Sequence, residues 1–147
     1  MRKSKGSPKK KKKLVEGESL KQLHKTAWAE WSIYIRTEGV DWKGMNNCFT
    51  CGTQYYWSQL QAGHYKHGKL DFCKKNIHKQ CVRCNKWLHG NLGVYAEKLI
   101  KKYGPGIFDE LDKLAKEEKS LNRLELKALI HDLKAKNGQT LKRLGLR

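Results

Sequence analysis

Two cysteine pairs constrain the fold of this chain more than any other feature of its sequence. The motifs CFTC and CVRC place Cys48 with Cys51 and Cys81 with Cys84, with 29 residues between the pairs. The turn of each CxxC brings its two sulfurs toward one ion, and four thiolates close the tetrahedral shell of a structural zinc site. The spacing is longer than in a compact zinc ribbon, so the intervening segment must contain structure of its own. We predict one structural Zn²⁺ on these residues and expect Cys73, outside the pattern, to be a small buried side chain.

The composition indicates why a metal site would stabilise the fold and what kind of partner the chain binds. Hydrophobic residues make up 38% of the 147, so any core is modest and gains from a metal staple. Lys and Arg number 32 against 14 Asp and Glu, a formal net charge of +18. That surplus indicates a polyanionic partner, usually nucleic acid, with an anionic membrane as the competing partner.

The sequence also predicts where the chain resides. It contains no apolar run long enough to span a bilayer, and its basic N-terminus lacks the apolar segment of a signal peptide. We therefore expect a chain that stays in a reducing cytoplasm, where cysteines bind metal or remain free thiols.

Three parts are expected along the chain. Residues 1–18 begin MRKSKGSPKKKKK, with eight basic residues, and are predicted to be a disordered arm that contacts phosphates or serves as a solubilising tail. Residues 19–105 should form the zinc domain with a helix at its N-terminal end. Residues 106–147 should form a helical C-terminal region.

Apolar residues at helical spacing in SLKQLHKTAWAEWSIYIRTEG predict a helix from about residue 20 to residue 37. Ser19 and Gln22 fit a capping box at its start. The aromatic side chains of this helix are expected to face the core.

Three more helices are predicted after the second cysteine pair, in NLGVYAEKLIKKYGPG, IFDELDKLAKEE and SLNRLELKALIHDLKAKNG. Asn91 is the expected cap of the first. Ser120 is the expected cap of the third, and Gly138 its expected end. The last nine residues fit no pattern.

The segment that carries the cysteines reads as short strands. TQYYWSQLQAGHY predicts two strands with a turn between them, and DFCKKNIHKQC predicts a further, weaker strand. CNKWLHGN reads as the first turns of a helix that leaves the second cysteine pair.

His64, in the stretch QAGHYKHGKL between the two cysteine pairs, has three conceivable roles. It could be a fifth metal ligand, a core histidine or a catalytic base. Four cysteines already complete the zinc shell, which removes the first role. The core histidine and the catalytic base both remain open on this ground alone.

The neighbours of His64 along the chain carry a resemblance to a known family. Asn76 lies five residues before Cys81, and Asn85 directly follows Cys84. This order resembles the zinc-bearing HNH (His-Me finger) endonucleases, here as an H-N-N variant. CFTCG, QAGHY and NIHKQCVRCN in this order are similar to the NinG (Rap) family of phage recombination endonucleases. The resemblance covers about residues 46–104, and the junction resolvases of the endonuclease VII type share the layout.

The resemblance implies a fold and a function. The expected fold class is α+β, with a small ββα-metal (treble-clef, HNH) core, a structural four-cysteine zinc site and flanking helices. The expected activity is structure-selective cutting of branched recombination intermediates such as Holliday junctions and D-loops, in the host cytoplasm. Expected partners are branched or double-stranded DNA, recombination proteins and a second copy of the chain, because resolving a junction takes two incisions. The alternative is a non-catalytic, zinc-stabilised module that binds nucleic acid and recruits partners.

The resemblance also implies roles for individual residues. His64 would be the general base, Asn76 would orient the loop or the imidazole, and Asn85 would hold a catalytic Mg²⁺ or Mn²⁺. His89, expected one turn further on the same helix face, and His78 would supplement the cation site.

One departure from the HNH pattern concerns that cation. Many HNH enzymes carry an Asp ligand directly before the strand histidine, where this chain has Gly63. Asp71 is the only carboxylate between the cysteine pairs, and its position matches no ligand position of the family. The cation must therefore find its oxygen or nitrogen ligands elsewhere.

Overall fold

The computed structural model describes residues 17–146, so almost all of the basic arm expected at 1–18 lies outside it. Within the described residues, no helix combines the length and the apolar character needed to cross a bilayer. The elements run in the order α1 (Leu20–Thr37), β1 (Met45–Asn47), β2 (Gln54–Tyr56), β3 (Leu60–His64), β4 (Ile77–Cys81), α2 (Leu92–Tyr103), α3 (Ile107–Glu117) and α4 (Arg123–Arg143).

The strands form two separate antiparallel hairpins, β1 with β2 and β3 with β4. The two strands predicted in TQYYWSQLQAGHY are confirmed as β2 and β3, but each pairs with a different partner. In the second hairpin Leu60 lies opposite Cys81, and His64 lies opposite Ile77. Register therefore fixes His64 at one end of the β3–β4 hairpin and a metal-ligating cysteine at the other.

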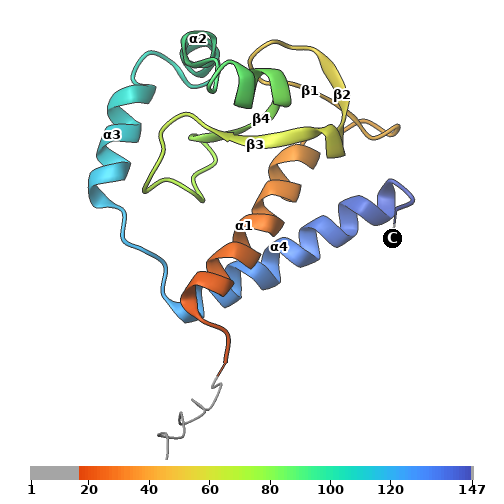
Figure 1. Ribbon diagram of the computed structural model, residues 1–147, viewed down its shortest axis with the longest axis vertical. Coiled ribbons are helices and arrows are strands. Elements are labelled where there is room, and N and C mark those ends of the chain that lie inside the picture. The colour runs from red at the N-terminus through yellow and green to blue at the C-terminus, as the bar shows by residue number, and fades with distance from the viewer. Residues whose placement is uncertain (1–16, 147) are drawn as a thin grey trace, which may run out of the picture.

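Helix α1 is confirmed over the residues predicted for it, with the Ser19–Gln22 capping box at its start. It lies against one face of the β3–β4 hairpin (Figure 1). Trp31 and Ile35 pack there on Ile77. Burial of these large apolar side chains anchors the helix to the hairpin that carries His64.

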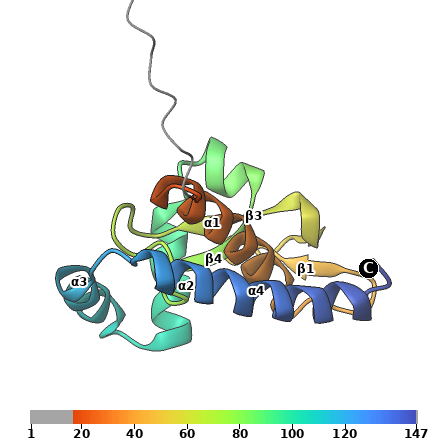
Figure 2. The same ribbon diagram turned by 90° about the horizontal axis from the view of Figure 1, so that it is seen from below.

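Helix α4 runs alongside α1, as the two views of Figures 1 and 2 show. Two expectations about it were wrong. Its cap is Asn122 rather than Ser120, because the Asn122 side chain and Glu125 form a capping box. Gly138 does not end it, and the helix continues to Arg143.

The continuation of α4 past its glycine has a tertiary cause. The Asn137 side-chain amide donates to the Glu30 backbone carbonyl on α1 at 2.9 Å, and Leu141, one turn on, is buried. These contacts offset the roughly 1 kcal/mol that a glycine costs inside a helix. The local sequence pattern alone therefore could not predict that the helix continues through these last residues.

Helices α2 and α3 enclose a second apolar cluster on the other side of the β3–β4 hairpin. Its buried members are Leu70, Tyr95, Leu99, Ile107 and Leu111, with Cys73 packed half-buried against them. The helix predicted in NLGVYAEKLIKKYGPG is confirmed as α2, and Tyr95 and Leu99 are its buried residues.

The helix predicted to leave the second cysteine pair is wrong. Residues Arg83–Trp87 make a single π-type turn, and the chain then reverses through left-handed conformations at His89, Gly90 and Asn91. The reversal is fixed because the Gly90 amide donates to the Cys84 carbonyl at 2.9 Å. A mixed helix and sheet fold with a four-cysteine cluster is thus observed, whereas the helix expected at this position in a ββα-metal core is reduced to one turn.

Candidate functional site

The four cysteines of the two pairs meet in one place. The sulfurs of Cys48, Cys51, Cys81 and Cys84 all lie within 4.8 Å of one another, and they form the only such potential metal-binding group among residues 17–146. Cys48 follows β1 and Cys81 ends β4, so the cluster joins the two hairpins. Four thiolates at this spacing suit one tetrahedral metal ion, and the donor set is that of structural zinc.

Hydrogen bonds to sulfur support this assignment. The backbone N–H of Cys81 donates to Cys48 Sγ at 3.2 Å, and that of Cys84 donates to Cys81 Sγ at 3.4 Å. Asn91 is the N-cap residue of α2 as expected, but its side chain makes no capping bond and donates to Cys84 Sγ at 3.6 Å instead. N–H donors aimed at the sulfurs are the kind of outer contact that orients metal-binding cysteines.

His64 is the last residue of β3, and its side chain lies on the α1 face of the hairpin. The imidazole stacks on Trp28 of α1 with ring centroids 4.8 Å apart, and on His67 at 5.1 Å. Its side chain is 18% exposed. His64 is thus neither fully buried nor free, since two aromatic rings fix its plane while solvent still reaches it.

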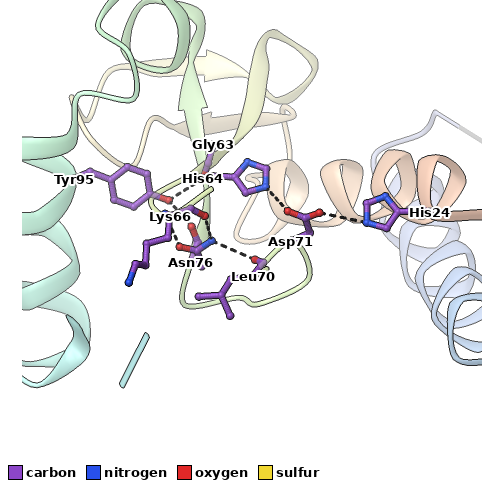
Figure 3. A network of polar contacts seen from close by, with 8 residues as sticks. All are labelled: His24, Gly63, His64, Lys66, Leu70, Asp71, Asn76 and Tyr95. Carbon is purple, nitrogen blue, oxygen red and sulfur yellow. Dashed lines mark hydrogen bonds and ion pairs between the residues drawn. The ribbon is translucent and has the colours of Figure 1, made fainter. Parts of the chain in front are cut away.

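The imidazole of His64 is held by a carboxylate that no sequence pattern placed beside it. Asp71 Oδ1 lies 3.0 Å from His64 Nε2, and Asp71 Oδ2 lies 3.3 Å from Nε2 of His24 on α1. Figure 3 shows Asp71 between the two histidine rings. A carboxylate accepts hydrogen bonds, so the proton of neutral His64 resides on Nε2 and Nδ1 keeps its lone pair.

Three influences act on the protonation of His64. Partial burial lowers its pKa, the Asp71 carboxylate opposes that effect without cancelling it, and the nearby His67 lowers the pKa further. The net pKa lies below the ordinary value of a histidine, so the ring is neutral at pH 7. A neutral imidazole with a free Nδ1 can accept a proton.

Asn76 is fully buried and organises the loop between β3 and β4. Its Oδ1 accepts from the Lys66 backbone N–H at 2.8 Å, while its Nδ2 donates to the carbonyls of Lys66 at 2.8 Å and Leu70 at 3.2 Å (Figure 3). Of the two roles foreseen for its amide, the contacts fit the orienting of the loop rather than of the imidazole. That loop carries Asp71 to His64.

Asn85 lies on the opposite face of β3 from the His64 ring. Its Nδ2 donates to Gln61 Oε1 at 2.8 Å, and its Oδ1 lies beside Gly63. The backbone of Gly63 is in turn fixed by Tyr95 of α2, whose hydroxyl donates to the Gly63 carbonyl at 2.9 Å. Asn85 and the His64 ring therefore lie on the two faces of the same strand end.

His78 and His89 lie outside this arrangement. His78 is buried in the core, with Nδ1 3.0 Å from the Tyr95 hydroxyl and Nε2 2.9 Å from the Tyr103 hydroxyl. Each of its ring nitrogens is in hydrogen-bonding distance of a tyrosine hydroxyl, so the contacts of His78 are those of a core residue rather than of a cation ligand. His89 is exposed in the left-handed turn rather than on a helix face shared with Asn85.

The buried His78 leads to a prediction about stability. Burial and then the nearby lysines lower the pKa of His78 from 6.5 to about 3. Between these two pH values His78 is protonated in the unfolded chain but stays neutral in the folded chain. Stability is complete above pH 6.5 and should fall by about 1.4 kcal/mol for each pH unit below it. Urea unfolding of the parent and of His78→Gln should show a larger loss below pH 6.5 in the parent than in the variant. Equal pH dependence in both proteins would contradict the assignment.

An open groove of about 710 Å³ runs along the unpaired edge of β3. Trp28, which stacks on His64, and Asn85 both line it, together with the cations Arg36 and Lys86. The groove thus joins the two faces of β3 at a surface that carries positive charge.

The sequence pattern singles out His64, Asn76, Asn85 and the cysteines, but it does not single out His24 and Trp28, which lie beside Asp71 and His64. Both missed residues come from α1, 40 and 36 positions before the strand histidine. No local motif signals them, because only the packing of α1 on β3 brings them to the site. Asp71 had one usable signal, its being the only carboxylate between the cysteine pairs.

The family profile and the sequence relatives that match this chain agree with one another. The profile of a family described as Bacteriophage Lambda NinG protein matches residues 1–143. The Protein ninG of Escherichia phage lambda is 42% identical over 69 residues, which cover 44% of this chain and 33% of that protein. The ninG proteins of Salmonella phage P22 and Escherichia phage 933W are also 42% identical, over 34% of their lengths. The chain spans about a third of these relatives, and no solved structure matches it.

Proposed function

This chain belongs to the family of the bacteriophage lambda NinG protein, and on that basis we propose that it is a metal-dependent endonuclease acting on branched DNA. The observation that carries the proposal is the His64 imidazole, held neutral at a strand end with its proton on Nε2 toward Asp71 and with Nδ1 unprotonated. A structural zinc on the four cysteines keeps the β3–β4 hairpin in register. The substrate class comes from the resemblance to the recombination endonucleases.

Hydrolysis of a phosphodiester requires an activated water, stabilisation of charge on the phosphorus, and assistance to the departing oxygen. His64 Nδ1 takes the proton from the attacking water, because it is the ring nitrogen that carries none. As the imidazole becomes cationic, the Asp71 carboxylate 3.0 Å from Nε2 stabilises the new charge. The Trp28 stack fixes the plane in which Nδ1 points.

Asp71 is a positioning residue in this mechanism, and its substitution gives a directional prediction. The amide introduced by Asp71→Asn could still accept a hydrogen bond from Nε2 but would lack the charge that raises the pKa of His64. The low-pH limb of the cleavage rate should therefore shift to lower pH. The plateau rate should fall by less than the roughly 10² to 10⁴-fold expected for losing the base itself.

The control for this pH profile is Asp112→Asn. Asp112 forms an exposed ion pair with Lys66 and does not touch His64, so its loss should leave the limb in place. An Asp71→Asn profile that coincides with that of the control would show that the carboxylate does not act on His64.

A divalent cation, Mg²⁺ or Mn²⁺, would supply charge neutralisation at the phosphate and at the leaving oxygen when bound. The residues beside Gly63 fit such an ion: an oxygen of Asn85 lies there, next to a buried side-chain oxygen of Gln80 that has no hydrogen-bond partner among residues 17–146. Hard cations prefer oxygen ligands of this kind. The cation position and His64 thus belong to adjacent residues at the end of β3, on its two faces.

DNA binding is supported by charge and by shape. The net charge of +18 suits a polyanion, and the groove along β3 presents Arg36 and Lys86 beside Asn85 and beside Trp28, the residue on which His64 stacks.

The experiment that tests the proposal is metal-dependent nicking of supercoiled plasmid by the full chain. Relaxed circles that appear with Mg²⁺ or Mn²⁺ and not with a chelator are the expected result. The competing function, a zinc-stabilised module that only binds DNA, is favoured by the missing carboxylate at Gly63. It predicts retarded DNA in a gel and no nicked product with either ion.

A further inference from the structure

The position where an HNH enzyme carries its strand carboxylate is filled in this chain from the neighbouring strand. A Cβ on residue 63 would collide with Oε1 of Gln80 and lie 3.0 Å from Oδ1 of Asn85. Gln80 belongs to β4, the strand that pairs with β3 in the hairpin. Two side-chain oxygens thus converge on the place that a ligand at position 63 would occupy.

The orientation of the Gln80 amide is fixed by its other end. Its Nε2 lies 2.9 Å from the carbonyl oxygen of Gly90 and 3.3 Å from the Thr50 hydroxyl. A carbonyl only accepts, so the NH₂ group must face Gly90 and the oxygen must face Gly63. The left-handed turn through Gly90, which breaks the expected helix, is therefore what aims this oxygen.

A buried side-chain oxygen without a hydrogen-bond partner is unusual in a folded protein, and a bound ligand would explain it. Gln80 is completely buried, and its Oε1 has no hydrogen-bond partner in the described part of the chain. An unpaired buried carbonyl oxygen destabilises the folded state, because it loses its hydrogen bonds to water and gains no other partner. An apolar side chain such as Leu would avoid that loss, so the amide calls for an explanation.

We propose that the amide oxygens of Gln80 and Asn85 are the protein ligands of the divalent cation, in place of the carboxylate that Gly63 lacks. This inference rests on the proposed nuclease function and deepens it by naming the ligand set. Gly63 is required because a side chain there would displace the Gln80 oxygen. Asn85 closes the site from the surface, where its single side-chain bond to Gln61 can yield to an incoming ion.

The chemistry of these ligands predicts how the cation binds. Both oxygens are neutral, whereas most Mg²⁺ sites use one or two carboxylates together with substrate phosphates. The free protein should therefore bind the ion weakly, and the phosphates of bound DNA should complete the site. Cation binding is thus expected to depend on DNA.

The test measures Mn²⁺ binding directly, by the loss of the free-ion electron paramagnetic resonance signal. The full chain carrying His64→Ala, which should not cut, is mixed with a four-way junction, and the Mn²⁺ bound by the DNA alone is subtracted. Gln80→Met, which keeps the volume and removes the oxygen, should weaken the protein-dependent binding at least about tenfold. Asn85→Ala should weaken it similarly. His89→Ala is the control and should leave it unchanged.

A second pair of variants distinguishes the loss of a cation ligand from a folding defect in Gln80→Met. Gln80→Ala makes room at position 63, so Gly63→Asp together with Gln80→Ala should restore Mn²⁺ binding that Gln80→Ala alone loses. Unchanged binding in Gln80→Met and Asn85→Ala, or loss in His89→Ala instead, would overturn the ligand assignment even if the parent protein cuts DNA. Conversely, DNA-dependent Mn²⁺ binding that follows Gln80 in a protein that cuts nothing would leave the site standing and refute the nuclease function.

Discussion

Replacement of His64 by alanine should lower the rate of DNA cleavage by roughly 10² to 10⁴-fold while leaving the affinity for a four-way junction unchanged. A general base contributes to the transition state and hardly to ground-state binding, so the loss appears in turnover. The free Nδ1 of His64 is the group removed, and the four-cysteine cluster that would hold the metal lies at the other end of the hairpin.

The alternative role of His64, as a core histidine, predicts a different result. The ring stacks on Trp28, so a purely structural residue would reduce folding and DNA affinity together when truncated. His131→Ala is the control, because His131 is an exposed histidine beside Asp132 on α4 and has no contact with His64. Asn85→Ala should also lower turnover, but part of its loss should return at high Mg²⁺ or Mn²⁺, whereas His64→Ala should not recover. Parent-level cleavage by His64→Ala would contradict the assignment.

Replacement of Cys81 by alanine should unfold the segment from residue 46 to residue 90. Cys81 ends β4, and its sulfur lies within the cluster that ties β1 to β4. Structural zinc contributes about 10–16 kcal/mol to the folding of zinc-finger peptides at pH 7, far more than the modest core of this hairpin can replace. The expected signs are loss of bound zinc and rapid amide hydrogen exchange across both hairpins.

Cys73→Ala provides the control for the metal site. Cys73 is half-buried beside the α2–α3 core and is not part of the cluster, so its replacement should retain one zinc per chain and full protection from exchange. A folded Cys81→Ala protein, or a parent protein with no zinc, would refute the structural role of the metal.

The parts of the fold that could be predicted are those with a strong local pattern. Helix α1 followed from apolar periodicity and from the Ser19 capping box, and both act within a few residues. The four-cysteine cluster followed from CxxC spacing, because a tight turn forces the two sulfurs of a pair together. Asn76 was singled out by its distance from Cys81, and its buried amide orders the loop before β4.

The rest depended on contacts between distant segments. Asp71 reaches His64 only because Asn76 folds the intervening loop, and His24 joins them only because α1 packs on the hairpin. Helix α4 continues past Gly138 because Asn137 bonds to α1. The turn through Gly90 replaces a helix because its carbonyl receives the Gln80 amide from β4. None of these long-range contacts produces a periodic pattern in the sequence from which it could be predicted.

The measurement that tests the account most directly compares cleavage of three DNA substrates of matched sequence, a linear duplex, a flap and a four-way junction, with Mg²⁺ by the full chain. We predict incision of the branched substrates at a higher rate than of the duplex, abolished by a chelator and by His64→Ala. Absence of product from every substrate with both Mg²⁺ and Mn²⁺, by a protein that still binds the junction, would contradict the account and show a zinc-stabilised DNA-binding module instead.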